Sequence, residues 1–494
     1  MGKHVLTLDL GSSGVRAVLV AVDRWRVVSV AERGYRVMRA QDGLAQRFSA
    51  NDLRSRMLDC LARAVGGSGV PTTDINAISV TAQRGGTAFL DDQGQTLYVG
   101  PNRDVRAVFE GAAIDDRLAA EVYATTGHLP SAFLAPAKVH WWREHQPRIA
   151  RRIATVVSLG AWAVRELTGE LRETGSTLVE LGLGDVGSGE AASALLGSLD
   201  MSPDQVPSLV ETGTPTGALA KAPAGAIGIA VGMSVALAGP DAQVAALGAG
   251  CVGVGEDAVM AGWSAPVQRV TAQPLHDVER RTWVVRGAVP GQWASEANPG
   301  DTGGTLDMVR RLLGSRMTVE RFDRLAADAP EADVPFVALW GPRALDMSNP
   351  GLSLGGLITG SPVTYGGIDA RQVARATLEN IAFAIHECAG VLDEVCGRGT
   401  GPVALTGGMA NSAAFGSLLA TMLGRPVRRQ DVHGAAIGAA VMAALAPRGW
   451  ASAGLELAKR GVLVEPGDSG LEMGERYERW LTLRRGLDAL ADEV

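Results

Sequence analysis

Short apolar strand patterns alternate with helical patterns along almost the whole of this 494-residue chain. The alternation opens with a predicted hairpin, in which strands at residues 4–10 and 15–22 flank a turn rich in glycine and serine. It closes with a strand at 402–406, a glycine turn and two helices. Strands that alternate with helices in both halves of a chain predict an α/β fold.

The length predicts two to four domains, since single domains usually hold roughly 100–200 residues. A stretch at residues 212–226 is rich in Thr, Pro, Gly and Ala, which is the composition of a linker. We therefore expect an N-terminal domain at residues 1–231 and a C-terminal domain at residues 232–494.

Charge and cysteine content exclude several classes of protein. The net charge of −7 argues against a nucleic-acid partner, because such proteins need a basic face to neutralise phosphates. The cysteines form no Cys-x-x-Cys pair and fit no zinc template. We expect them to be buried, unpaired side chains of a cytosolic protein. They are Cys60, Cys251, Cys388 and Cys396.

Two apolar segments could suggest a membrane or export signal. Asp9 and Arg16 interrupt the N-terminal run, so we expect no signal peptide and a cytoplasmic location. Residues 222–240 carry no charge, but glycines and prolines interrupt them repeatedly. We expect that segment to be a buried strand leading into a turn, and we expect no membrane partner.

Glycine is about twice as abundant as usual, with 63 residues, which predicts many tight turns and close backbone approaches. The literal dinucleotide pattern at Gly248, Gly250 and Gly253 follows a predicted helix rather than a strand. It therefore argues against a nicotinamide cofactor. The sequence contains no phosphate-binding loop of the Walker type.

Three strand–turn segments carry residues suited to phosphate chemistry. In the first hairpin Asp9 ends a strand, and the following turn offers backbone N–H groups and serine hydroxyls to an anion. An ordinary hairpin would look the same, but Asp241 also follows a predicted strand, at a helix start. Gly407 and Gly408 separate another strand from a helix and would let a flat ring approach the backbone. Together the three turns predict a site for a nucleotide, Mg²⁺ and a catalytic acid or base.

These motifs, in this order, resemble the FGGY family of carbohydrate kinases, which belongs to the superfamily of actin, hexokinase and the Hsp70 chaperones. The resemblance covers roughly residues 4 to 450. Its motifs are Asp9-x-Gly11-Ser12-Ser13-x-x-Arg16, Gln83-Arg84, Asn102-x-Asp104-x-Arg106, Gly239-Pro240-Asp241-Ala242-Gln243, Gly262-Trp263-Ser264, Gly341-Pro342-Arg343, Gly407-Gly408-Met409-Ala410-Asn411-Ser412 and Gly438-Ala439-Ala440.

The resemblance implies a two-lobed, actin/hexokinase/Hsp70-like (ribonuclease H-like) α/β fold with an active-site cleft between the lobes. It implies ATP and Mg²⁺ as cofactors, with Asp241 as general base and Asp9 and Asp241 beside the metal. It also implies three sets of binding residues. The phosphates would meet Gly11, Ser12, Ser13, Arg16, Gly262 and Ser264; the adenosine would meet Gly407, Gly408, Met409 and Asn411; and the acceptor would meet Gln83, Arg84, Asp104 and Asp241.

Three residues depart from the family pattern. Trp263 stands where relatives usually have threonine, Met409 replaces a glycine of the adenosine motif, and Asn102 replaces a tryptophan. Other tryptophans could face a sugar, although packing is the simpler role for each of them. They are Trp142, Trp283 and Trp293.

The motifs point to different acceptors. Residues 9–15 resemble the xylulose kinases, Gln83-Arg84 resembles the glycerol kinases, and Asn102-x-Asp104-x-Arg106 with residues 290–313 resembles the autoinducer-2 kinases. We favour a pentulose such as xylulose, or a related short polyol. An autoinducer-2 kinase is the second hypothesis, and a nucleotide-binding regulatory protein with little activity is the third. The expected partner is a small sugar or polyol, and a homodimer is left open.

Overall fold

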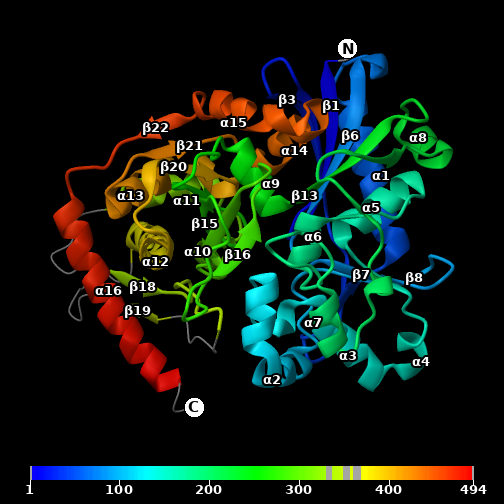
Figure 1. The fold of residues 1–494 in the computed structure, drawn as a ribbon. Coiled ribbons are helices and arrows are strands. Elements are labelled where there is room, and N and C mark those ends of the chain that lie inside the picture. The colour runs from blue at the N-terminus through cyan, green and yellow to red at the C-terminus, as the bar shows by residue number, and fades with distance from the viewer. Residues whose placement is uncertain (1–2, 330–335, 349–356, 360–368, 492–494) are drawn as a thin grey trace. The chain divides into compact units, whose positions relative to one another are not determined.

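The computed structural model describes residues 3–329, 336–348, 357–359 and 369–491. The chain packs as two compact units, each assembled from three separate stretches of sequence (Figure 1). Unit 1 comprises Met1–Val252, Thr271–Ala294 and His433–Leu457, and unit 2 comprises Gly253–Val270, Ser295–Val432 and Ala458–Val494. These units describe packing, and the family boundary expected between residues 231 and 232 stays a prediction.

A six-stranded sheet forms the centre of unit 1, in the order β12-β13-β6-β1-β2-β3. The expected hairpin is confirmed, because β1 pairs antiparallel with β2. β1, β6 and β13 run parallel to one another and read as nearly continuous buried runs, which is typical of strands covered on both faces. The strands are β1 (His4–Leu10), β2 (Gly14–Ala21), β3 (Arg26–Gly34), β6 (Ile75–Ala82), β12 (Pro215–Ala218) and β13 (Ser234–Pro240).

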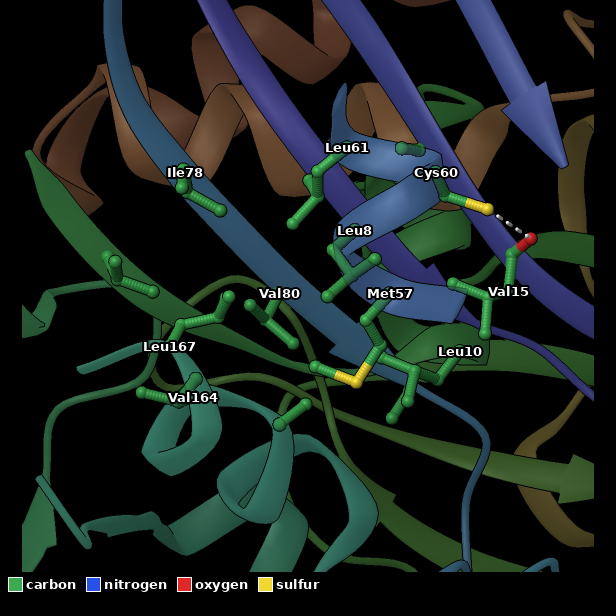
Figure 2. Close-up of a cluster of buried hydrophobic side chains, with 14 of the residues drawn as sticks. Leu8, Leu10, Val15, Met57, Cys60, Leu61, Ile78, Val80, Val164 and Leu167 are labelled. Atoms are coloured by element: carbon green, nitrogen blue, oxygen red, sulfur yellow. Dashed lines mark hydrogen bonds between the residues drawn. The ribbon is translucent and has the colours of Figure 1, made fainter. Parts of the chain in front are cut away.

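Helices α1 (Ala50–Gly66) and α5 (Leu159–Thr168) pack their apolar side chains against this sheet (Figure 2). Ser49 caps the start of α1, because its hydroxyl accepts a hydrogen bond from the Asp52 N–H. Gly169 ends α5 in the left-handed conformation, with φ +84°. Figure 2 shows the strand and helix side chains meeting in one apolar layer, among them Leu8, Leu10, Met57, Leu61, Ile78, Val80, Val164 and Leu167.

Residues 212–226 are not the linker that their composition predicted. They contain β12 and most of α8 (Lys221–Ile227), and β12 pairs antiparallel with β13 at the edge of the sheet. The uncharged stretch 222–240 contains most of α8 and then β13, so the expected buried strand is confirmed for residues 234–240, whereas the helix before it was not expected. Within the described residues, no helix has both the length and the apolar character needed to cross a membrane.

Two glycine-containing helices of unit 1 lie in very close contact. They are α9 (Asp241–Gly248) and α14 (Gly434–Ala444). A Cβ atom on Gly248 would overlap the carbonyl oxygen of Gly434, and one on Gly438 would overlap that of Val244. The first glycine of the literal dinucleotide pattern therefore ends a helix, as the sequence predicted, and serves helix packing.

Unit 2 is built around β15, β14, β20, β21 and β22, which are neighbours in that order. Its core side chains come from the sheet and its helices, and include Phe383, Leu405, Phe415 and Trp480. The elements are β14 (Glu256–Met260), β15 (Val267–Thr271), α10 (Thr302–Leu313), α11 (Val319–Ala327), α12 (Ala370–Cys396), β20 (Thr400–Thr406), α13 (Ala413–Leu423), β21 (Val427–Arg429), β22 (Val462–Val464) and α16 (Gly470–Ala491).

The remaining elements are shorter or lie outside the two main sheets. The strands are β4 (Val37–Arg39), β5 (Gln46–Phe48), β7 (Thr87–Leu90), β8 (Thr96–Gly100), β9 (Thr155–Ser158), β10 (Glu173–Thr174), β11 (Leu209–Val210), β16 (Trp283–Arg286), β17 (Trp293–Ala297), β18 (Val337–Leu339) and β19 (Leu357–Thr359). The helices are α2 (Val108–Thr126), α3 (Ala135–His145), α4 (Pro147–Ala150), α6 (Gly175–Glu180), α7 (Ser193–Ser198) and α15 (Trp450–Ala458).

Candidate active site

Three predicted site segments of unit 1 follow strands whose carboxyl ends lie side by side at one end of the sheet. β1, β6 and β13 are parallel neighbours, and Ala82 at the end of β6 is paired with both Leu10 and Pro240. Asp9, the pair Gln83-Arg84 and Asp241 therefore lie at the carboxyl ends of adjacent strands, where open α/β sheets commonly bind ligands. We call this set of strand ends the unit 1 edge.

Asp9 is the buried carboxylate of the unit 1 edge. It is directly opposite Arg16 in the β1–β2 register, and the Arg16 Nη1 lies 3.5 Å from its Oδ2. Burial raises the pKa of Asp9, the Arg16 charge lowers it, and the charge of Glu32, which also pairs with Arg16, raises it. The turn of Gly11, Ser12 and Ser13 joins the two strands. A Cβ on Gly14 would overlap the Arg33 carbonyl oxygen, so this end of the turn requires glycine.

Gln83 ties the turn between β1 and β2 to the loop that follows β8. Its side-chain Nε2 donates to the Gly11 carbonyl at 3.1 Å, and its Oε1 accepts from the Asn102 N–H at 3.1 Å. Only 3% of Gln83 is exposed. The residue expected to contact the acceptor thus also holds two neighbouring segments of the site in place.

Asp241 begins α9, directly after the left-handed Gly239 (φ +108°) and Pro240. Its Oδ1 accepts a hydrogen bond from the Ala242 N–H at 2.9 Å. Desolvation and the Asp9 charge raise the pKa of Asp241 to about 7, while the Arg84 charge lowers it. A carboxylate with a pKa near neutrality can accept a proton and release it again under physiological conditions.

The donor set at this edge fits a hydrated Mg²⁺ ion. The Oδ1 of Asp9 is buried and has no hydrogen-bond partner among the described residues. Asp9 and Asp241 lie close enough that the charge of Asp9 raises the Asp241 pKa. Mg²⁺ prefers carboxylate oxygens and usually retains several waters, so two carboxylates beside a phosphate suit it.

Asp104 is fully buried and its carboxylate has several protein partners. It accepts from the Gln46 N–H at 2.9 Å and from the Tyr98 hydroxyl, and it pairs with Arg106 at 2.8 Å. The Arg106 guanidinium in turn lies over the rings of Tyr98 and Trp141, each at 4.9 Å. A role of Asp104 in binding the acceptor stays a prediction. In the structure, its hydrogen bonds and ion pair hold the loop that carries Asn102 in place.

The predicted aromatic candidates have different surroundings. Trp142 is 4% exposed and packs against Phe89 and Tyr98. The Trp293 indole N–H donates to the Val186 carbonyl at 2.8 Å. Trp283 lies nearest to a predicted site residue, because the Arg84 guanidinium sits 5.1 Å from its ring centroid.

In unit 2, two predicted nucleotide motifs also meet at one sheet edge, which we call the unit 2 edge. β14 and β20 are parallel, with Met260 opposite Thr406, and the turns at Gly262–Ser264 and Gly407–Asn411 follow them directly. Gly407 has φ +93°, and a Cβ there would lie 2.6 Å from the Ala261 carbonyl oxygen. The Met409 N–H donates to that same oxygen at 3.1 Å, so the two turns are in contact.

The two departures from the family pattern in unit 2 have different surroundings. The Trp263 carbonyl accepts a hydrogen bond from the Gly303 N–H at 2.7 Å, in the first turn of α10. Met409 is 4% exposed and belongs to the apolar core of unit 2, so its backbone is the part suited to a ligand. A Cβ on Gly408 would have no neighbour within 4 Å, which leaves room for a flat group. Asn411 is exposed and its carbonyl accepts from Arg429.

Comparison with protein families decides the class of the chain. The model for the N-terminal domain of the FGGY family of carbohydrate kinases matches residues 4–248, and the model for the C-terminal domain of that family matches residues 258–446. The chain belongs to the FGGY family of carbohydrate kinases. It is therefore a phosphotransferase that acts on small sugar-type substrates, and membership of a kinase family implies ATP as its phosphate donor.

Individual relatives of this FGGY kinase agree on the class. It is 26% identical over 488 residues to YoaC of Bacillus subtilis (strain 168), whose name describes a sugar kinase, with 98% of this chain and 97% of the relative covered. It is 26% identical over 473 residues to the autoinducer-2 kinase of Klebsiella pneumoniae, with 89% and 85% covered.

The fold of this FGGY kinase matches solved kinase structures. The xylulose kinase from Rhodospirillum rubrum superposes with a TM-score of 0.81 at 25% identity, covering 99% of this chain and 100% of the other. The ligand-bound xylulose kinase from Lactobacillus acidophilus superposes with a TM-score of 0.83 at 17% identity, covering 99% of each. The predicted actin/hexokinase-like α/β fold is confirmed.

Sequence reasoning gave no role to several buried polar residues of the FGGY kinase near its unit 1 edge. Glu180, His128 and Gln243 contact one another or Arg84, and Lys138 is fully buried with its Nζ donating to the Gly85 carbonyl at 3.1 Å. One signal was visible for Glu180, since it is the single charged residue between positions 175 and 184. Gln243 ends the motif that carries Asp241 but had no role of its own, and His128 and Lys138 lie in no motif.

Proposed function

We propose that this FGGY kinase transfers the terminal phosphate of ATP to a hydroxyl group of a pentulose such as xylulose, or of a related short polyol. The observation that carries the proposal is the placement of Asp9, Gln83-Arg84 and Asp241 at the carboxyl ends of three adjacent parallel strands. The classes of two relatives, sugar kinase and xylulose kinase, support the acceptor class.

In this proposal Asp241 acts as general base. Its carboxylate accepts the proton of the acceptor hydroxyl while the hydroxyl oxygen bonds to the terminal phosphorus and the bond from that phosphorus to the leaving ADP oxygen breaks. The pKa of about 7 suits this task, because a substantial fraction of Asp241 is ionised near neutral pH. Arg16 and the backbone N–H groups of the turn from Gly11 to Ser13 would donate to phosphate oxygens.

Asp9 and Asp241 are the residues that would hold Mg²⁺. When bound, Mg²⁺ would neutralise negative charge on the phosphate oxygens. The unit 2 edge would take the nucleotide, with the glycine backbone at Gly407 and Gly408 against the adenosine and the turn at Gly262–Ser264 near the phosphates. No disulfide joins the four cysteines, all of which the structure describes, and this is consistent with the reducing cytoplasm as the place of the reaction.

A coupled assay of ADP release tests the proposal on a panel of acceptors. The panel contains xylulose, ribulose, xylitol, ribitol, glycerol, gluconate and the autoinducer precursor, each with ATP and Mg²⁺. We expect the highest kcat/KM on a pentulose or a short polyol. Turnover on none of the panel, with ATP still bound, would support a regulatory protein instead.

An autoinducer-2 kinase is the second candidate. It is favoured by the 26% identity to the autoinducer-2 kinase of Klebsiella pneumoniae over most of both chains. The same panel separates the two, because a kcat/KM that is highest on the autoinducer precursor would replace the pentulose assignment.

A further inference from the structure

A buried carboxylate joins three polar side chains of unit 1 near the proposed base. Glu180 ends α6 and is 4% exposed. Its Oε2 lies 3.3 Å from the His128 Nε2 and 4.0 Å from the Arg84 Nη1, and its Oε1 accepts a hydrogen bond from the Gln243 side-chain amide. We call these four residues, Arg84, His128, Glu180 and Gln243, the Glu180 cluster.

The surroundings of the cluster restrict the position of Arg84. Its guanidinium lies over the Trp283 ring on one side and near Glu180 on another. The Trp283 ring also contacts the His128 ring, with centroids 5.0 Å apart, and its N–H donates to the Leu129 carbonyl. The His128 Nδ1 lies 2.6 Å from the Thr126 carbonyl oxygen, which holds that ring as well. A guanidinium held by a ring and a carboxylate has little freedom to move.

The cluster lies near Asp241 along the chain and interacts electrostatically with it. Gln243 follows Asp241 by two residues on α9. The Arg84 charge lowers the pKa of Asp241 and the Glu180 charge raises it, so both lie within electrostatic reach of that carboxylate. The Oε1 of Gln243 is buried without a hydrogen-bond donor among the described residues, and a hydroxyl group could supply one.

The charges around Arg84 influence whether a charged or an uncharged acceptor binds. An arginine without a carboxylate partner binds a ligand carboxylate strongly, often through two parallel hydrogen bonds. Here Glu180 already lies beside Arg84, and Asp9 and Asp241 add two more negative charges at the same edge. A ligand carboxylate at this edge would be repelled by these three acids.

We propose that Glu180 is a positioning residue that holds Arg84 and Gln243 beside the acceptor and makes the site select uncharged polyhydroxyl compounds over polyhydroxy carboxylates. The inference deepens the proposed function and rests on the acceptor binding at the unit 1 edge. It assigns the selection to a residue that lies outside the motifs that identify the family.

The test replaces Glu180 by glutamine, which keeps the shape and removes the charge. Isothermal titration in the presence of ADP and Mg²⁺ measures the Kd of xylitol and of gluconate for the wild type and Glu180→Gln. We expect the wild type to prefer xylitol. We expect the variant to weaken xylitol binding, to tighten gluconate binding and to shift the ratio of the two Kd values by roughly 10- to 100-fold.

Glu173→Gln is the matched control. Glu173 is also a fully buried glutamate beside α6, but its partners are Ser158, Thr174 and Thr177 rather than cations. We expect this variant to lower the melting temperature while leaving the xylitol-to-gluconate ratio within twofold of the wild type. A Glu180→Gln protein that is folded and retains the wild-type ratio would overturn the proposal.

A double variant keeps the test decisive if Glu180→Gln does not fold. Arg84→Met with Glu180→Met removes both charges and leaves neither one buried alone. We expect it to bind gluconate no more tightly than the wild type, because the gain requires Arg84 without its partner; tighter gluconate binding would overturn the proposal. The titrations need no turnover, so absence of kinase activity on the panel would refute the proposed function without deciding the role of Glu180.

Discussion

In unit 1, the adjacent ends of β1, β6 and β13 carry two aspartates and an arginine, whereas in unit 2 the ends of β14 and β20 lead into glycines. The charged side chains at the unit 1 edge interact over several ångströms and shift one another's pKa values. The unit 2 edge depends on backbone contact, with the Met409 N–H donating to the Ala261 carbonyl and no room for a Cβ on Gly407.

The two edges should therefore lose function through different kinds of substitution. A substitution at the unit 1 edge can keep its shape and still remove the chemistry, because one charge is enough. A substitution at the unit 2 edge acts by adding atoms, because its function lies in what glycine leaves out. The four predictions below test this contrast between the edges.

Asp241→Asn should give the largest effect. We expect kcat to fall by roughly 10²- to 10⁴-fold, because the general base is lost while the shape is retained. The Kd of ADP, measured by titration without Mg²⁺, should stay within twofold of the wild type, since the substitution leaves the unit 2 edge intact. Asp92→Asn, at an exposed turn of the same unit, serves as the control and should keep full activity. Undiminished kcat in Asp241→Asn would remove it from the role of base.

Asp9→Asn should act on metal dependence. We expect the Mg²⁺ concentration for half-maximal activity to rise roughly 10- to 100-fold, because a carboxylate replaced by an amide loses its charge toward the ion. The measurement is a Mg²⁺ titration of ADP release at saturating ATP. An unchanged Mg²⁺ requirement would show that Asp9 does not hold the metal.

Gly407→Ala should weaken the nucleotide site through its backbone. Both the left-handed φ and the 2.6 Å approach to the Ala261 carbonyl oppose a side chain, so we expect a stability loss of about 1–3 kcal/mol and weaker ADP binding. Gly408→Ala is the matched variant, because a Cβ there meets nothing within 4 Å. It should keep its stability and still bind ADP more weakly, if the adenosine lies against that backbone. Normal ADP binding by Gly408→Ala would place the ring elsewhere.

Lys138→Met should change the pH dependence of stability. Burial lowers the pKa of Lys138 from 10.5 to about 8, so between those values the unfolded chain binds more protons than the folded one. The contribution of this lysine to stability therefore rises from pH 8 to 10.5, by about 3 kcal/mol at most. Urea denaturation across that range should show a steeper rise for the wild type than for the variant. Parallel curves would mean that the buried amine does not titrate there.

The sequence predicted most elements that border the site. The strand predicted at residues 4–10 has the expected bounds, and the strand predicted at 402–406 ends where expected, because their apolar patterns are strong. β12 was missed, since Pro215–Ala218 is short and contains residues with weak strand preference. Its pairing with β13 stabilises it, and such pairing leaves no local pattern.

The candidate site was predictable in part. Turns that bear glycine, serine and aspartate can be read locally, and the structure brings the predicted groups together within each unit. Arg84 and Gln243 of the Glu180 cluster lie in predicted motifs, but their contacts with Glu180, and through it with His128, could not be predicted, because these residues meet only through the fold. No spacing rule connects residues so far apart, and each one alone is an ordinary buried or polar residue.

Unit 1 can be completed only after residues 433–457 have been synthesised, because it is built from three separate stretches of the chain. α14 supplies Ala436 and Ala440 to an apolar cluster with Val5, Val18 and Val20 of the first two strands. While the ribosome is still translating the central part of unit 2, that face of the N-terminal sheet has no helix to cover it. The nascent chain must keep an apolar strand surface from associating with other chains until residues 433–457 emerge. Production of this kinase should therefore be sensitive to the supply of ribosome-associated chaperones.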